Sequence, residues 1–102
     1  MPPSQNTSTP STPQNFRATY VSTNTIQVSW DSSWNANNYT LDLAYDSSFN
    51  NILNNVTTAN LNYTFTNLTP STTYFIRLKA NNNYGSSGYT SISVTTLPIG
   101  YT

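Results

Sequence analysis

The chain has 102 residues, a formal net charge of zero and only 6% charged residues. This length suffices for one domain with a single core and is too short for two. The low charge argues against binding to nucleic acids or anionic membranes, because both require several Lys and Arg side chains. The only basic residues, Arg17, Arg77 and Lys79, are too few and too dispersed for such a role.

The residue types needed for common catalytic chemistry are missing. The chain has no His, Cys or Glu, which removes the usual general bases, activated nucleophiles and thiolate ligands. Its only carboxylates are Asp31, Asp42 and Asp46. On one extended strand Asp42 and Asp46 would share a face but lie about 13 Å apart, too far for a shared proton or metal ion. We therefore predict no enzyme activity, no cofactor and no metal site.

Residues 1–13 differ in composition from the rest of the chain. They contain four Pro residues among Ser, Thr, Gln and Asn, with no clear core residue. Such a composition is typical of an extended, semi-stiff linker or tail. We therefore expect a linker over 1–13, a domain over 14–97 and the start of a second linker over 98–102. About half of the chain is Asn, Ser or Thr, and this composition favours an extracellular or cell-surface location.

The domain region contains short runs in which apolar residues alternate with polar ones, separated by turn residues. This period of two predicts β-strands, and no run has a helical period. The runs lie at Phe16–Ala18, Ile26–Trp30, Tyr39–Tyr45, Tyr63–Phe65, Tyr74–Ala80 and Tyr89–Thr96, and a further short strand is expected after Phe49. The sequence therefore predicts an all-β sandwich of about seven antiparallel strands in two sheets.

A corner between two strands is predicted at Leu68-Thr69-Pro70-Ser71-Thr72-Thr73-Tyr74. Pro70 has a fixed φ that suits the turn, and Tyr74 begins the next alternating run. A Tyr at such a corner buries its ring while its hydroxyl bonds to the backbone a few residues upstream. We expect Leu68, Pro70 and Tyr74, together with the strand residues Trp30 and Tyr39, to hold the fold, and the buried indole N–H of Trp30 to need a partner.

The order of these motifs resembles the fibronectin type III domain, in particular those of bacterial extracellular modular proteins. The resemblance rests on Trp30, the Leu68-x-Pro70…Tyr74 corner and the Tyr84-Gly85-x-Ser loop that follows the Tyr74 run. It implies a Greek-key, Ig-like β-sandwich in which Asp42 faces outward beside Arg77 or Lys79. We expect an exposed ion pair there, worth well under ~1 kcal/mol. In bacterial members a Phe at the position of Phe49 tucks under the sheet edge.

Two hypotheses for function follow. The first is a rigid, monomeric spacer in a larger extracellular protein, with neighbouring domains as its partners. The second is a carbohydrate- or protein-binding module, natural or engineered, because Trp, Tyr, Asn and Ser are typical of recognition loops. Its candidate residues, expected at one end of the sandwich, are Trp34, Asn37, Asn83, Tyr84, Ser86 and Tyr89. Alternatively, Trp34 plugs the open end of the core and Tyr84 belongs to a turn whose ring lies on the sheet.

Overall fold

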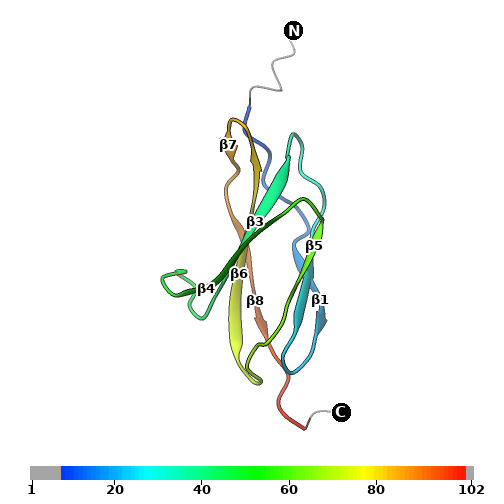
Figure 1. Cartoon of the computed structure of the whole chain (residues 1–102), viewed down its shortest axis with the longest axis vertical. Helices are drawn as coiled ribbons and strands as arrows, with labels where there is room; N and C mark the ends of the chain where they lie inside the picture. Colours follow the sequence, from blue (N-terminus) through cyan, green and yellow to red (C-terminus); the bar gives the residue numbers. More distant parts are fainter. Residues whose placement is uncertain (1–7, 101–102) are drawn as a thin grey trace.

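A computed structural model describes residues 8–100, and all regular elements in this range are β-strands (Figure 1). They are β1 (Arg17–Val21), β2 (Ile26–Ser29), β3 (Asn38–Ala44), β4 (Ile52–Thr58), β5 (Asn62–Phe65), β6 (Thr73–Asn82), β7 (Gly85–Ser86) and β8 (Thr90–Thr95). The predicted all-β fold is confirmed. The additional strand relative to the expected seven is the two-residue β7, which forms a hairpin with the end of β6.

The strands form two antiparallel sheets. One sheet has the order β1-β2-β5, and the other has the order β4-β3-β6, with β7 and β8 both paired to β6. The β3 strand pairs with β6 over its whole length, so that Asp42 lies opposite Arg77. The first and last described residues lie at opposite ends of the long axis (Figure 1). A neighbour on either side of the chain would therefore be attached at a different end of the sandwich.

The core lies between the two sheets and follows the alternating pattern of the strands. Successive side chains of a strand point to opposite faces, so every second residue of β2, β3 and β6 faces inward. Fully buried examples are Ile26 and Val28 of β2, Leu41 of β3, and Ile76 and Leu78 of β6. The same periodicity that indicated strands therefore also identified most of the core.

Trp30, directly after β2, packs between two other aromatic rings. Its ring makes edge contacts with Phe16 and Tyr39, with centroids 6.1 Å and 5.5 Å away. Such edge-to-face pairs contribute about 0.5–1.5 kcal/mol each beyond the burial of their area. The indole Nε1 of Trp30 has no hydrogen-bond partner within residues 8–100, contrary to the expectation for a buried Trp. The aromatic contacts thus account for its position without a hydrogen bond.

Hydrogen bonds close the corner between β5 and β6 from two sides. The hydroxyl of Tyr74, which is 1% exposed, accepts a bond of 2.8 Å from the backbone N–H of Thr69. From the end of β8, the Thr96 hydroxyl donates to the carbonyl of Thr69 and accepts from the N–H of Thr72. The N–H of Leu68 donates to the carbonyl of Asn24 in the β1–β2 turn. The corner is therefore tied to both sheets.

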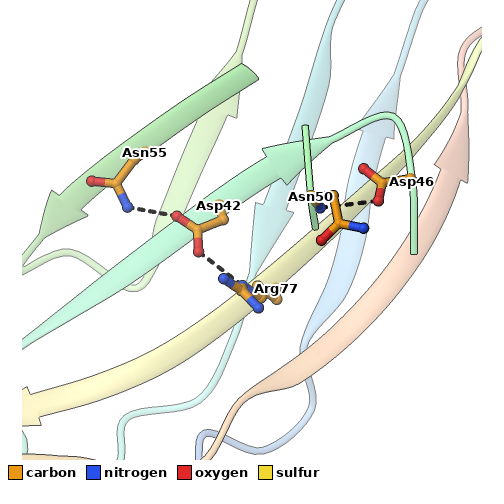
Figure 2. Close-up of polar contacts among 5 residues, drawn as sticks. All are labelled: Asp42, Asp46, Asn50, Asn55 and Arg77. Carbon is orange, nitrogen blue, oxygen red and sulfur yellow. Dashed lines mark hydrogen bonds and ion pairs between the residues drawn. The ribbon is translucent and has the colours of Figure 1, made fainter. Parts of the chain in front are cut away.

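The β3–β4 connection differs from the sequence-based expectation. Asp46 does not share a strand face with Asp42, because β3 ends at Ala44. Its carboxylate instead accepts backbone N–H bonds from Asn50 at 3.0 Å and Asn51 at 3.1 Å, and Figure 2 shows it turned toward Asn50. These donors lower the pKa of Asp46 below its usual value, because they stabilise the ionised carboxylate. The strand that follows, β4, is seven residues long rather than short.

Candidate functional site

One end of the sandwich, which we call the loop end, consists of the β2–β3 connection and the β6–β7 hairpin. Between them lies a hollow of about 260 Å³ lined by Asn35, Asn37, Asn82, Asn83 and Tyr84. The lining is almost entirely amide groups and backbone, with one aromatic ring. Such a surface can form many neutral hydrogen bonds but offers little apolar area.

The structure brings together part of the predicted ligand-binding set at this end. Asn37, Asn83 and Tyr84 line the hollow, and Tyr84 is 55% exposed. Trp34 belongs to the same loop end and is 52% exposed, so its ring does not plug the core. Ser86 does not line the hollow, and its hydroxyl donates a hydrogen bond to Asn81 Oδ1 at 2.7 Å.

The segment 8–13 packs against the loop end, although its composition had indicated a linker. The carbonyl of Ser8 accepts hydrogen bonds from Nδ2 of Asn35 at 2.8 Å and from Nδ2 of Asn82 at 2.7 Å. Ser11 exchanges two bonds with the backbone of Trp34: its N–H donates to the Trp34 carbonyl at 3.2 Å, and its hydroxyl accepts from the Trp34 N–H at 3.0 Å. These four hydrogen bonds cannot be predicted from composition, because they depend on where the two loops lie in the fold.

Proline rings complete the docking of this segment. Pro10 and Pro13 are both buried, so the segment contributes apolar area as well as backbone acceptors. The amide of Asn82 serves as the bridge: its Nδ2 also donates to the carbonyl of Asn35 at 3.1 Å, and its Oδ1 accepts the N–H of Tyr84 at 2.8 Å. Many of the hydrogen-bonding groups of the loop end are therefore already paired with other groups of the chain.

A second cluster lies on the outer face of the β4-β3-β6-β8 sheet and is centred on Arg77. Its Nε donates to Oδ2 of Asp42 at 2.8 Å, and Nδ2 of Asn55 donates to the other carboxylate oxygen (Figure 2). The guanidinium carbon lies 4.5 Å from the ring centroid of Phe49 and 4.1 Å from that of Tyr89. Arg77 is therefore stacked between two aromatic rings while it pairs with a carboxylate.

The expected pairing of Asp42 with Arg77 is present, but the expectation that it would be exposed is wrong. Asp42 is only 2% exposed even though it lies on the outer face of the sheet. The β3–β4 connection brings Phe49 over Arg77, while Asn55 of β4 binds the carboxylate from the other side. A buried ion pair of this kind is costly to break, because loss of one partner leaves the other charge without compensation.

Tyr89 lies with this second cluster rather than at the hollow of the loop end. It precedes β8, is 44% exposed, and contacts both Arg77 and Lys79, whose Nζ is 5.2 Å from the ring centroid. Arg77 and Lys79 are two positions apart on β6, so their side chains project from the same face of the sheet. Two of the three basic residues of the chain are thus brought together, which corrects the expectation that they are dispersed.

A second hollow of about 240 Å³ lies where β3 and β4 meet the corner, with Leu43, Tyr45 and Leu53 among its lining residues. No three potential metal ligands of the His, Cys, Asp and Glu types cluster anywhere in residues 8–100. Over the same range, no helix has the length and apolar character needed to cross a membrane.

Comparisons with known proteins agree with the architecture. The model of the fibronectin type III domain family matches residues 11–96. The crystal structure of FN3tt is 29% identical, with a TM-score of 0.79, over 88% of this chain and 97% of that one. The fibronectin type III domain of human fibronectin type III domain containing protein 3 is 25% identical, with a TM-score of 0.73, over 94% of both chains.

A more distant structure shows the same fold. The fn3 domain of human collagen alpha-1(XX) chain is 16% identical, with a TM-score of 0.80, over 99% of this chain and 98% of that one. No curated protein gave a significant match. The match to the family model covers most of the chain and includes the strands, the corner and both loops described above. The chain therefore belongs to the fibronectin type III domain family.

Proposed function

We propose that this domain is a non-catalytic spacer in a larger extracellular or cell-surface protein, where it holds neighbouring domains at a defined separation. The observation that carries the proposal is the docking of residues 8–13 against the loop end. Hydrogen bonds from Asn35 and Asn82 to the Ser8 carbonyl extend the rigid part of the domain beyond β1. Residues 8–13 are therefore held in a fixed direction relative to the sandwich.

The opposite end of the domain is anchored in a similar way. The N–H of Leu97 donates to the carbonyl of Ser22 at 3.0 Å, and the carbonyl of Leu97 accepts from the N–H of Ser71 at 3.2 Å. The chain thus enters at one end of the long axis and leaves at the other, with hydrogen bonds at both points (Figure 1). A spacer requires this arrangement, because a flexible joint at either end would shorten the mean distance between its neighbours.

The test is a tandem protein in which two copies of the chain are joined end to end. Small-angle X-ray scattering should give an extended particle with a narrow distribution of distances. In the matched control, residues 8–13 of the second copy are replaced by a Gly/Ser sequence of equal length, and the particle should become more compact and more variable. Identical scattering curves for the two proteins would contradict the spacer proposal.

A second candidate function is recognition of a neutral polysaccharide or of a protein at the loop end. It is favoured by the half-exposed rings of Trp34 and Tyr84 beside the amide-lined hollow. Aromatic faces provide stacking area, and amides match the hydroxyl groups of sugars. An amide chemical-shift titration with neutral oligosaccharides should then give saturable changes at residues 34–37 and 82–84. No change across a broad panel of oligosaccharides and candidate proteins would count against recognition.

A further inference from the structure

The outer face of β6 concentrates positive charge on an otherwise almost uncharged molecule. We define the β6 basic face by Arg77, Lys79 and Tyr89. Both cationic groups lie against the same tyrosine ring, with Arg77 Cζ at 4.1 Å and Lys79 Nζ at 5.2 Å from its centroid. The remaining basic residue, Arg17, is on β1 of the other sheet. The two cations are therefore close neighbours on a single surface.

The guanidinium of Arg77 is held in place before any ligand arrives. Asp42 binds its Nε, and the rings of Phe49 and Tyr89 stack against it. Within residues 8–100, neither Nη1 nor Nη2 of Arg77 donates a hydrogen bond, and the side chain is 25% exposed. A fixed guanidinium with unused donors loses little conformational entropy when it binds an acceptor.

The charge balance leaves this face positive. Asp42 compensates Arg77, and the pair they form is the only ion pair among the described residues. No carboxylate in the described range lies within ion-pair distance of Lys79. One net positive charge therefore remains beside Tyr89, which is 44% exposed.

We propose that the β6 basic face binds carboxylate groups of an acidic polysaccharide, such as a polymer of uronic acid units. Lys79 and the free edge of Arg77 supply the charge and the donors for the carboxylate. Ser91 and Ser93 of β8 lie opposite Arg77 and Phe75 of β6 and are exposed, so their hydroxyl groups extend the surface that sugar hydroxyls can reach. This site is separate from the loop end and goes beyond the spacer function.

A sugar acid fits this surface better than an acidic peptide does. The face combines a low net charge with an aromatic ring and neutral hydroxyl groups. This combination suits a sugar unit that carries one carboxylate and several hydroxyl groups. An acidic peptide such as oligo-aspartate also carries one carboxylate per unit, but it has no hydroxyl groups to pair with those of Ser91 and Ser93. Electrostatic attraction should still contribute, so binding should weaken as salt rises and the screening length falls to ~10 Å near 0.1 M.

The experiment is a chemical-shift titration of the whole chain with oligogalacturonate, with fully methyl-esterified oligogalacturonate as the matched neutral probe. We expect saturable shifts at residues 77–79 and 89–93 with the acid and none with the ester. Lys79→Gln should weaken binding by about 2–5-fold, the range of an exposed ion pair. Arg17→Gln removes one positive charge from the other sheet and should leave the affinity unchanged.

Several results would overturn the proposal. These are equal binding of the acid and the ester, equal effects of Lys79→Gln and Arg17→Gln, or tighter binding of an oligo-aspartate peptide than of the sugar acid. Shifts confined to residues 34–37 and 82–84 would also overturn it and would support recognition at the loop end instead. The scattering test of the tandem protein measures shape rather than binding, so the spacer proposal and the carboxylate-binding proposal can be rejected independently.

Discussion

The hydroxyl of Tyr74 accepts a hydrogen bond of 2.8 Å from the backbone N–H of Thr69, across the corner that joins the two sheets. The ring of Tyr74 is buried and lies 5.4 Å from the ring of Tyr45. One side chain thus fixes the corner through a polar contact and fills the core through an apolar one.

Tyr74→Phe should separate these two contributions. The variant keeps the ring in the core but leaves the Thr69 N–H without its partner, which should cost about 1–3 kcal/mol of unfolding free energy. Urea denaturation monitored by circular dichroism measures this loss. Tyr20→Phe, at a ring that is 57% exposed, is the matched control and should leave the midpoint unchanged. Equal midpoints for Tyr74→Phe and the wild type would contradict the role of the corner bond.

Arg77→Met should destabilise the domain more than an exposed ion pair would allow. Asp42 is 2% exposed and would lose its charged partner, and breaking buried pairs costs about 3–5 kcal/mol. We expect the lower end of this range, because Arg77 is 25% exposed. The double variant Asp42→Asn/Arg77→Met should recover part of the loss, since the uncompensated charge is removed.

A double-mutant cycle over the two positions measures their coupling. We expect a coupling free energy clearly above that of exposed ion pairs, which is about 0.2–1 kcal/mol. A value within that exposed range would mean that Asp42 is solvated in solution.

Asp46 should make the stability of the β3–β4 connection depend on acid pH. Its pKa is lowered by the N–H donors of Asn50 and Asn51, so the folded state favours the ionised form. This contribution is present above the ordinary Asp pKa of about 3.9 and is lost as the pH falls through the lowered value. Asp46→Asn should therefore be less stable than the wild type at pH 7, and the difference should shrink toward pH 2. A difference that does not change with pH would contradict the assignment.

The two Trp residues should report opposite environments. Trp30 is 2% exposed and Trp34 is 52% exposed. Trp34→Phe should leave a blue-shifted emission spectrum that iodide quenches poorly, because only the buried ring remains. Equal quenching of Trp30 and Trp34 in the wild type would contradict the packing of Trp30 between Phe16 and Tyr39.

The sequence was sufficient for the fold because the fold depends on local patterns. Alternation placed Ile26 and Leu41 in the core, and the spacing from Leu68 to Tyr74 indicated the corner. The pairing of Asp42 with Arg77 could also be anticipated, since the register of two neighbouring strands determines it.

The features that were missed depend on where connections lie in space. Asp42 is buried because the turn stabilised by Asp46 brings Phe49 over Arg77, and no strand periodicity encodes the path of that turn. Tyr89 was grouped with the loops by its position in the sequence, whereas its side chain lies on the sheet beside Lys79. Burial of Pro10 and Pro13 likewise requires a surface formed by residues distant in the sequence.

The most direct test of the spacer account is a {1H}-15N heteronuclear NOE measurement over residues 8–13, in the wild type and in Asn82→Ala. The variant removes the amide that donates to the Ser8 carbonyl at 2.7 Å. We expect wild-type values for the N–H groups of residues 8, 9, 11 and 12 equal to those of the β-strands, and lower values for residues 8 and 9 in the variant. Low values across this segment in the wild type would show a flexible joint and would contradict the account.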